Sequence, residues 1–144
     1  MRRDRPQAAD SITIPDAVRG ATVLVTGGAG FVGSHLARAL AGACDVRVID
    51  DLSAGTRSRV PDDVTFVEGD LRDTGALVPA AEGVDYVFHQ AGLASVPESV
   101  RKPVESHGRN VDATLDVLEA ARRNDARVVF ASSVAVYGEP ETTP

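Results

Sequence analysis

The sequence predicts an α/β protein built on a doubly wound parallel sheet, and three observations support this. Short apolar runs rich in β-branched residues recur along the chain, as expected for strands buried on both faces. Amphipathic stretches of helical length separate several of these runs, and a glycine-rich segment follows the first run. The expected strands are 22–25, 46–49, 64–67, 86–88 and 128–131. Alternating strands and helices favour right-handed crossovers between parallel strands.

Two helices are expected from their apolar periodicity, and a third stretch is weaker. The first should end near Gly42, which is suited to a helix terminus, and its predicted buried face is Val32, Leu36, Ala39 and Leu40. The second should bury Val111, Leu115, Leu118 and Ala121, with Arg122 and Arg123 in its last turn, where positive charge suits the helix dipole. The segment 73–82 is a poorer candidate, because Pro79 should interrupt a helix that begins at Asp73.

Composition and charge narrow the class of protein. The 144 residues are enough for one domain, and 43% of them are hydrophobic and 25% charged. A net charge of −6 argues against a nucleic-acid partner. One cysteine, Cys44, allows no internal disulfide, and the three histidines lack the spacing of metal ligands, so no metal site is expected. No apolar run approaches the roughly 20 residues of a membrane helix, and a cytoplasmic location is expected.

The chain divides by composition into two parts. Residues 1–20 are polar and contain proline, and we expect them to form a flexible lead with one short ordered stretch at 12–14. The arginines of this lead are not followed by the apolar core that a signal peptide needs. Residues 21–144 carry the strand and helix pattern and should form one dinucleotide-binding domain.

The strongest motif is the glycine-rich segment between the first strand and the first helix. Gly28, Gly30 and Gly33 make G-x-G-x-x-G, and Gly27, Gly30 and Gly33 make G-x-x-G-x-x-G. Residues without a Cβ allow a tight turn and let a pyrophosphate approach the backbone, while the helix N-terminus offers N–H groups to the anion. Such a pattern alone often marks only a turn, but here a strand precedes it and a helix follows it.

An acidic residue at the end of the second strand strengthens the interpretation. Asp50 follows Gly30 by 20 residues, the spacing at which a carboxylate accepts hydrogen bonds from the adenosine ribose diol. Asp51 beside it should add to the repulsion of a 2′-phosphate. The residues therefore predict a Rossmann sheet of strand order 3-2-1-4-5 that binds NAD in preference to NADP. The alternative, a solvated Asp-Asp loop, fits the spacing less well.

Six ordered stretches resemble one family over residues 21–139. They are VLVTGGAGFVGSHLARAL, VIDDLSAG, FVEGDLRD, VFHQAGLASVPESV, NVDATLDVLEAAR and VVFASSVAVYGEP. The chain resembles the extended short-chain dehydrogenase/reductases, and within them the NAD-dependent epimerase/dehydratase family of the UDP-glucose 4-epimerase type. Two positions depart from the family pattern, since Arg109 stands where a second Asn is frequent and Asp51 stands at another frequent Asn position.

The resemblance implies a role for each matching residue. Phe31 and Val32 should present their backbone to the pyrophosphate, and Asp70 and Leu71 should flank the adenine. Ser133 matches the catalytic serine, and Ser95, Val96 and Glu98 match a loop near the sugar. The residues implied to contact the cofactor are Gly27, Gly30, Phe31, Val32, Gly33, Asp50, Asp51, Leu52, Ser53, Gly55, Asp70, Leu71, Gln90, Ala91, Gly92, Leu93 and Asn110.

The resemblance also implies a reaction, transient hydride transfer at a carbon of a nucleotide sugar, and this chain lacks part of its machinery. The family uses a tyrosine and a lysine four residues later, on one helix face. Here Gln90 follows Tyr86 and Glu141 follows Tyr137 at that spacing. We therefore expect the N-terminal portion of such an enzyme, inactive alone and with a sheet incomplete at its C-terminal end.

Other possibilities stay open at this point. The family commonly dimerises through helices flanking the sheet, so a homodimer is possible. A non-catalytic NAD-binding module that senses redox state or docks on a partner would also fit the missing Tyr–Lys pair. A structural or RNA-associated member of the fold fits less well, because the net charge is −6. The nucleotide sugar, and whether it is epimerised or dehydrated, are left open by these motifs.

Overall fold

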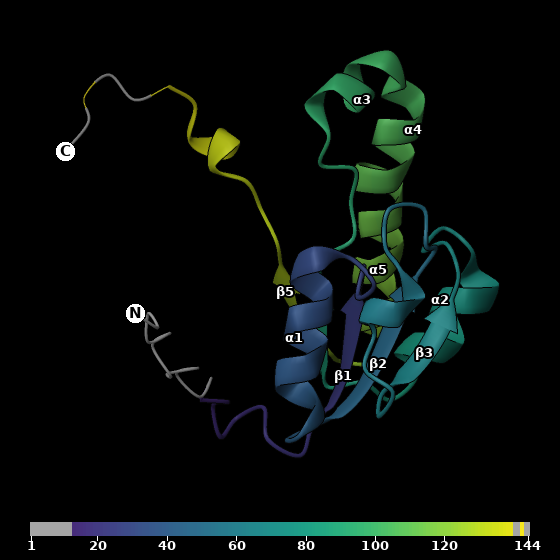
Figure 1. Ribbon diagram of the computed structural model, residues 1–144, viewed down its shortest axis with the longest axis vertical. Helices are drawn as coiled ribbons and strands as arrows, with labels where there is room; N and C mark the ends of the chain where they lie inside the picture. Colours follow the sequence, from purple (N-terminus) through teal and green to yellow (C-terminus); the bar gives the residue numbers. More distant parts are fainter. Residues whose placement is uncertain (1–12, 140–141, 143–144) are drawn as a thin grey trace, which may run out of the picture.

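A five-stranded parallel sheet forms the centre of the computed structural model, which describes residues 13–139 and 142 (Figure 1). Its strands are β1 (Thr22–Thr26), β2 (Asp45–Asp50), β3 (Thr65–Glu68), β4 (Tyr86–His89) and β5 (Arg127–Phe130). The order is β3-β2-β1-β4-β5, and every neighbouring pair is parallel. The predicted fold class and strand order are confirmed.

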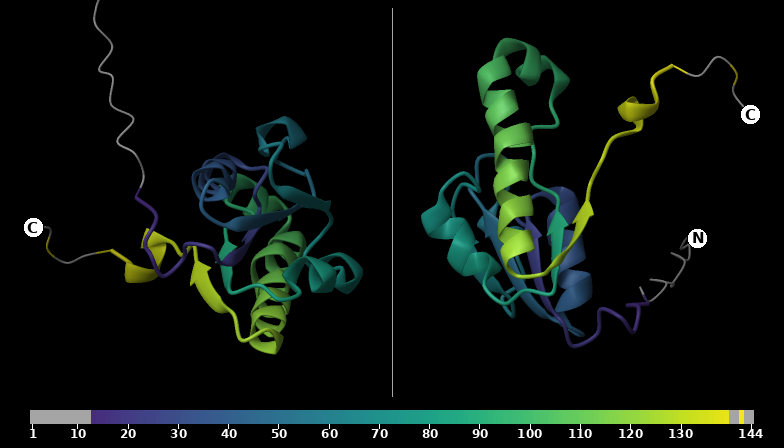
Figure 2. Two further views of the ribbon diagram at one scale, coloured as in Figure 1. Left: turned by 90° about the horizontal axis from the view of Figure 1, so that it is seen from below. Right: turned by 180° about the vertical axis from the view of Figure 1, so that it is seen from behind.

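Helices cover both faces of the sheet (Figure 2). Helix α1 (Phe31–Ala41) covers one face, where Ala37 and Leu40 pack with Val23, Val25 and Val48 of the inner strands. Helices α2 (Thr74–Ala81) and α5 (Ala113–Arg123) cover the other face. Each central strand is therefore apolar on both sides, which explains its near-continuous apolar sequence.

Several short elements lie beyond the carboxyl ends of the strands. Helices α3 (Val96–Arg101) and α4 (Pro103–His107) rise above this edge and join α5 through the π-helical turn η2 (Gly108–Asp112) (Figure 1). The 3₁₀ turn η1 (Arg57–Arg59) precedes β3. The 3₁₀ turn η3 (Val134–Tyr137) follows β5 on a segment that runs away from the sheet (Figures 1 and 2).

The predicted buried face of the second helix is wrong for three of its four residues. Val111, which lies in η2, and Leu115 and Leu118 of α5 are 43%, 59% and 45% exposed. Helix α5 buries Ala113, Val117 and Ala120 against the sheet and α2, together with Ala121, the one predicted residue that is buried. Both sets of residues have helical spacing, and the sheet side takes the set dominated by small side chains. The predicted face of α1 is only partly right, since Leu40 is buried but Val32 is 59% exposed.

Helix α2 forms despite its internal proline. Asp73 caps the first turn by accepting a hydrogen bond from the Gly75 N–H (2.9 Å). Pro79 removes only one backbone donor, while Leu77, Ala80 and Ala81 are buried in the core. Burial of this apolar face therefore outweighs the missing hydrogen bond.

The residues before β1 contact the domain. Ile14 is buried among residues of the α1 face, and the Gly20 N–H donates to the Ala43 carbonyl (2.7 Å). The Tyr86 hydroxyl donates to the Ala17 carbonyl (3.0 Å). Residues 1–12 of the expected lead lie outside the described residues. Within the described part of the chain, no helix has the length and apolar character needed to cross a membrane.

Candidate cofactor-binding site

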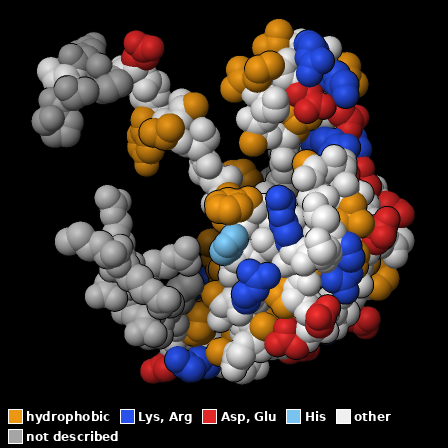
Figure 3. Space-filling view, in the orientation of Figure 1, with side chains coloured by type: hydrophobic (Ala, Val, Ile, Leu, Met, Phe, Trp, Pro, Cys, Tyr) orange, Lys and Arg blue, Asp and Glu red, His pale blue; other side chains and the backbone are white. Residues whose placement is uncertain are grey.

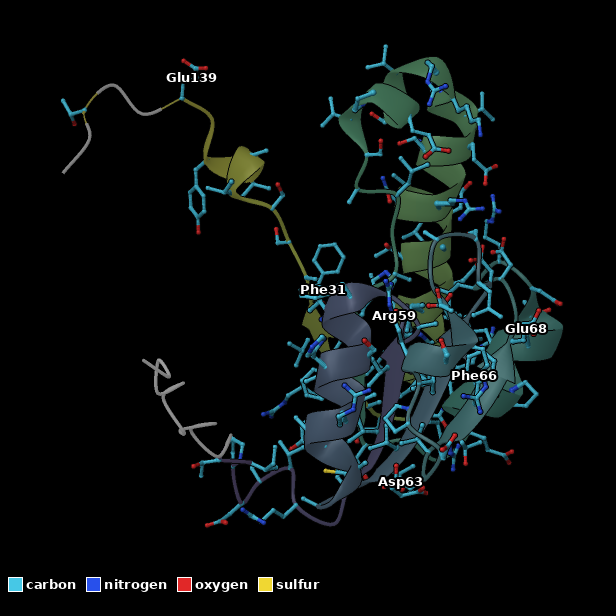
Figure 4. All side chains as sticks on the ribbon, viewed as in Figure 1. Phe31, Arg59, Asp63, Phe66, Glu68 and Glu139 are labelled. Carbon is cyan, nitrogen blue, oxygen red and sulfur yellow. The ribbon has the colours of Figure 1, made fainter. Side chains whose placement is uncertain are left out.

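The glycine-rich turn joins β1 to α1 through backbone packed too closely for side chains. Gly27 has φ of +66°, and a Cβ there would lie 2.7 Å from the Ala91 nitrogen. A Cβ on Gly33 would lie 2.3 Å from the Gly27 oxygen. The turn therefore leads into the N-terminus of α1 as bare backbone, and the first N–H groups of a helix have no partner within it. Phe31 and Val32, predicted to contact a pyrophosphate, are the first two residues of that helix (Figure 4).

Asp50 ends β2 beside this turn and is buried, with 9% of its surface exposed. One carboxylate oxygen accepts from the Ala29 N–H (2.9 Å), and the other accepts from the Leu52 N–H (2.8 Å). These bonds orient the carboxylate, and an ionised carboxylate has capacity for further donors. Leu52 adopts a left-handed conformation with φ of +57°, which turns the chain sharply after Asp50.

The loop after Asp50 is held by a residue far along the chain. Asp51 accepts hydrogen bonds from the backbone and hydroxyl of Ser53. Arg109 of η2 donates to the Ser53 hydroxyl (2.6 Å) and forms an ion pair with Asp51 (3.2 Å). The same guanidinium contacts Glu105 of α4 (2.5 Å). Arg109 therefore links the loop after β2 to the helices above the sheet.

Asp70, after β3, is paired with a second arginine. The Arg72 guanidinium donates to both of its carboxylate oxygens, with the shortest contact at 2.6 Å. This hydrogen bonding lowers the pKa of Asp70 to about 2. Arg72 also lies 3.6 Å from Glu105, so the loops after β2 and β3 meet in one charge network. Asp70 is therefore ionised and already paired where contact with the adenine was predicted.

The loop after β4 is fixed by Asn110. Its side-chain oxygen accepts from the Leu93 N–H (2.7 Å), and its side-chain nitrogen donates to the Leu93 carbonyl (3.1 Å). The Gln90 and Ala91 N–H groups lie 3.2 Å from the Thr26 hydroxyl of β1. Two consecutive residues of η2, Arg109 and Asn110, thus hold the loops that follow β2 and β4 at the carboxyl edge.

These loops line an open pocket at the carboxyl edge of the sheet. Parallel sheets of this kind bind ligands outside the carboxyl ends of their strands. Most of the residues predicted to contact the cofactor are brought together here. The lining residues are Gly27, Gly30, Ile49, Asp50, Asp51, Ser53, Ala54, Gly55, Gly69, Asp70, Leu71, Gln90, Ala91, Gly92, Arg109 and Ala113.

Other predicted residues do not line this pocket. Ser133 is exposed on the segment after β5, where its hydroxyl accepts from the Ala135 N–H (3.2 Å). Ser95 caps α3, Val96 is 72% exposed, and Glu98 pairs with Lys102 at 3.2 Å. Figure 3 shows hydrophobic side chains exposed on the same two regions, the α3–α4 projection and the C-terminal segment. Among residues 13–139 and 142, no His, Cys, Asp and Glu cluster could hold a metal ion.

Two arginines of the site are not predicted as site residues from the sequence. Arg109 is only a departure from the family pattern there, and Arg72 has no predicted role. Asp51, the partner of Arg109, lies far away in the chain, so no local motif contains that pair, whereas Asp70 lies only two residues before Arg72. The π-helical turn that directs Arg109 toward Asp51 has no clear sequence signature, although such turns are frequent at functional sites.

Comparison with known sequences gives consistent matches. A family model described as the NAD dependent epimerase/dehydratase family matches residues 23–144. The UDP-glucose 4-epimerase of Azospirillum brasilense is 48% identical over 126 residues, which is 85% of this chain and 36% of that protein. The UDP-glucose 4-epimerase of Streptomyces lividans is 44% identical over 126 residues, 84% of this chain and 38% of that protein. The chain spans little more than a third of these relatives.

Solved structures of epimerases are also similar to this chain. A UDP-N-acetylglucosamine 4-epimerase from Methanobrevibacter ruminantium M1, solved with UDP-N-acetylmuramic acid, has a TM-score of 0.81 and 40% identity. The match covers 88% of this chain and 42% of that chain. A UDP-glucose 4-epimerase from Brucella ovis, solved with NAD, has a TM-score of 0.80 and 43% identity, covering 87% of this chain and 39% of that chain.

Proposed function

Because the chain belongs to the NAD-dependent epimerase/dehydratase family, we propose that it is the NAD-binding part of a nucleotide-sugar epimerase or dehydratase. The reaction would be transient hydride transfer at a sugar carbon, and NAD+ would supply the nicotinamide that accepts and returns the hydride. The observation that carries this proposal is the glycine turn, which meets the Asp50 carboxylate at one pocket on the carboxyl edge. Residues 21–144 form the cofactor-binding domain in this proposal.

The pocket supplies a partner for each part of the dinucleotide. The bare backbone of the glycine turn and the first N–H groups of α1 hold the pyrophosphate. Asp50, oriented by two backbone donors, accepts from the adenosine ribose diol. Leu71 and Asp70 border the adenine, and the loop 90–93 lies beside the nicotinamide half. Ser133 is the proposed catalytic residue, and Ser95, Val96 and Glu98 belong to the proposed sugar side.

Calorimetric titration with NAD+ and NADP+ tests the proposal. The wild-type chain should bind NAD+ more tightly, because the buried Asp50 carboxylate repels a 2′-phosphate. Asp50→Asn should weaken NAD+ binding roughly tenfold or more, the cost of losing hydrogen bonds to a charged acceptor. Asp50→Asn should also reduce the difference between the NAD+ and NADP+ affinities.

Asp45→Asn is the matched control, since Asp45 is exposed at the opposite end of the same strand. It should leave both affinities unchanged. Equal affinity of the wild-type chain for NAD+ and NADP+ would contradict the proposal. An Asp50→Asn variant that binds NAD+ as tightly as the wild type would also contradict it.

A second candidate function is a non-catalytic NAD-binding module. It is favoured by one observation, that none of the 144 residues forms the Tyr–Lys pair at the spacing of four. Incubation of the chain with NAD+ and UDP-glucose tests the non-catalytic module. Formation of UDP-galactose would rule this module out, whereas NAD+ binding without turnover is expected of both candidates.

A further inference from the structure

The charges around the pocket are unequally compensated. Asp50, Asp51 and Asp70 line it, and Arg109 is the one cationic side chain among its lining residues. Asp70 is paired with Arg72, and Asp51 is paired with Arg109 at 3.2 Å. Asp50 contacts only backbone N–H groups in the described part of the chain. Asp50 therefore remains a net negative charge, whereas Asp51 is largely neutralised.

Arg109 is held in a defined position beside Asp51. Its Nη1 contacts both Asp51 and Ser53, while its Nε contacts Glu105. The arginine and aspartate side chains are 30% and 29% exposed, so water screens the pair only in part. Glu105 keeps a second partner, Arg72 at 3.6 Å, so it does not depend on Arg109 alone.

We propose that the Asp51–Arg109 ion pair is a selectivity element whose two members shift the NAD+/NADP+ preference in opposite directions. This inference rests on the proposed function, which places the adenosine ribose at Asp50. NADP+ differs from NAD+ by one phosphate on that ribose, so the charge of neighbouring side chains acts mainly on NADP+. Asp51 alone disfavours the phosphate, Arg109 alone attracts it, and the pair cancels. Asp50 then carries the discrimination.

The sequence predicts that Asp51 is a second repulsive charge, because it is adjacent to Asp50 in the chain. The structure gives Asp51 a cationic partner from η2, which no reading of the loop alone could provide. The side chain at position 109 therefore acts on selectivity without lying in the glycine motif or in the loop 50–55.

A double-mutant cycle tests the proposal, with the ratio of the NADP+ and NAD+ dissociation constants as readout. Arg109→Gln frees the charge of Asp51 and should raise the ratio about three- to tenfold. Asp51→Asn removes a negative charge beside Arg109, which keeps Glu105 as a partner, and should lower the ratio by a similar factor. The double variant should return close to the wild-type ratio. A purely structural role would weaken both dinucleotides equally and leave the ratio unchanged.

Two controls sharpen the cycle. Arg101→Gln removes one positive charge from exposed α3, away from the pocket, and should leave the ratio unchanged. Raising NaCl from about 0.05 M to about 0.5 M should shrink both single-variant shifts, because salt screens them.

The outcomes separate this inference from the proposed function. A wild-type chain that prefers NAD+, with both single variants at the wild-type ratio, would overturn the ion-pair proposal and leave the proposed function standing. Shifts of the same sign in both variants would also overturn it. A wild-type chain that binds neither dinucleotide would overturn both.

Discussion

His89 is a buried histidine in a continuous hydrogen-bonded chain behind the pocket. It is 1% exposed, with Nδ1 2.7 Å from the Thr26 hydroxyl and Nε2 2.9 Å from the Thr114 hydroxyl. The Thr114 hydroxyl donates to the Asn110 carbonyl (2.7 Å), so it accepts from His89 Nε2. Nδ1 then accepts from Thr26, whose oxygen accepts from the Gln90 and Ala91 N–H groups. This series of hydrogen bonds requires a neutral imidazole on His89.

Stability should therefore fall as the solution becomes acidic. Burial lowers the pKa of His89 below its ordinary value of 6.5, so the unfolded chain takes up this proton more readily than the folded chain. The contribution is fully present above pH 6.5 and is lost as pH falls from there toward the lower folded-state pKa. Uptake of one proton can change the free energy of unfolding by at most about 1.4 kcal/mol per pH unit.

Urea unfolding between about pH 7.5 and about pH 5.5 measures this slope. His89→Gln should be less stable than wild type at neutral pH but should lose less stability on acidification. His107→Gln, at an exposed histidine of α4, is the control and should keep the wild-type slope. Identical slopes for wild type and His89→Gln would contradict the assignment of a neutral His89.

At the residue scale, short-range motifs are predictable and long-range partners are not. Gly27, Gly33 and Asp50 could be found because each lies at a strand end or in a turn with its own local signature. The same reasoning could not pair Asp51 with Arg109 or His89 with Thr114, because those contacts depend on how α5 and η2 sit over the sheet. Ser133, assigned only by resemblance, stays a prediction.

At the element scale, helix α5 shows the limit of periodicity. Its outward stripe contains Leu115 and Leu118 and continues from Val111 of η2, and its buried stripe is mostly alanine. Hydrophobicity alone favours the leucine stripe as the buried one, which is why the prediction was wrong. Close approach of the helix to the sheet favours small side chains, and spacing does not reveal this. The outward stripe is an exposed apolar surface.

We expect this stripe to pair with a second copy of the chain, since exposed apolar patches of this kind mark association sites. Leu115→Glu should raise the dimer dissociation constant at least about tenfold, by burying a charge at the contact. It should change the free energy of unfolding by only about 0.5 kcal/mol, because Leu115 is 59% exposed. Sedimentation equilibrium measures the first quantity and urea unfolding the second.

Val78→Glu is the matched control, because Val78 of α2 is 46% exposed and lies outside the stripe. It should leave self-association unchanged. A wild-type chain that is monomeric at all concentrations would contradict the pairing of α5. Equal effects of Leu115→Glu and Val78→Glu on the dimer dissociation constant would also contradict it.

At the scale of the whole molecule, the architecture follows from the order of strands and helices. Alternation predicted a parallel sheet, and the glycine turn with Asp50 predicted the order in which β1 lies at the centre. That order places the pocket where the chain reverses direction across the sheet, between β1 and β4. The course of the segment after β5 could not be predicted, because 131–139 carry no strong periodicity. Phe130 at that edge is 54% exposed.

The central claim is that the carboxyl-edge pocket binds NAD+, and amide chemical-shift mapping by NMR tests it most directly in a chain of 15.0 kDa. Titration with NAD+ should shift the amides of residues 27–33, 50–55 and 90–92 saturably. The amides of residues 62–64 and 82–85, at the opposite edge, should stay unchanged. Saturable shifts confined to that opposite edge, or no shifts with NAD+ in large excess, would contradict the account.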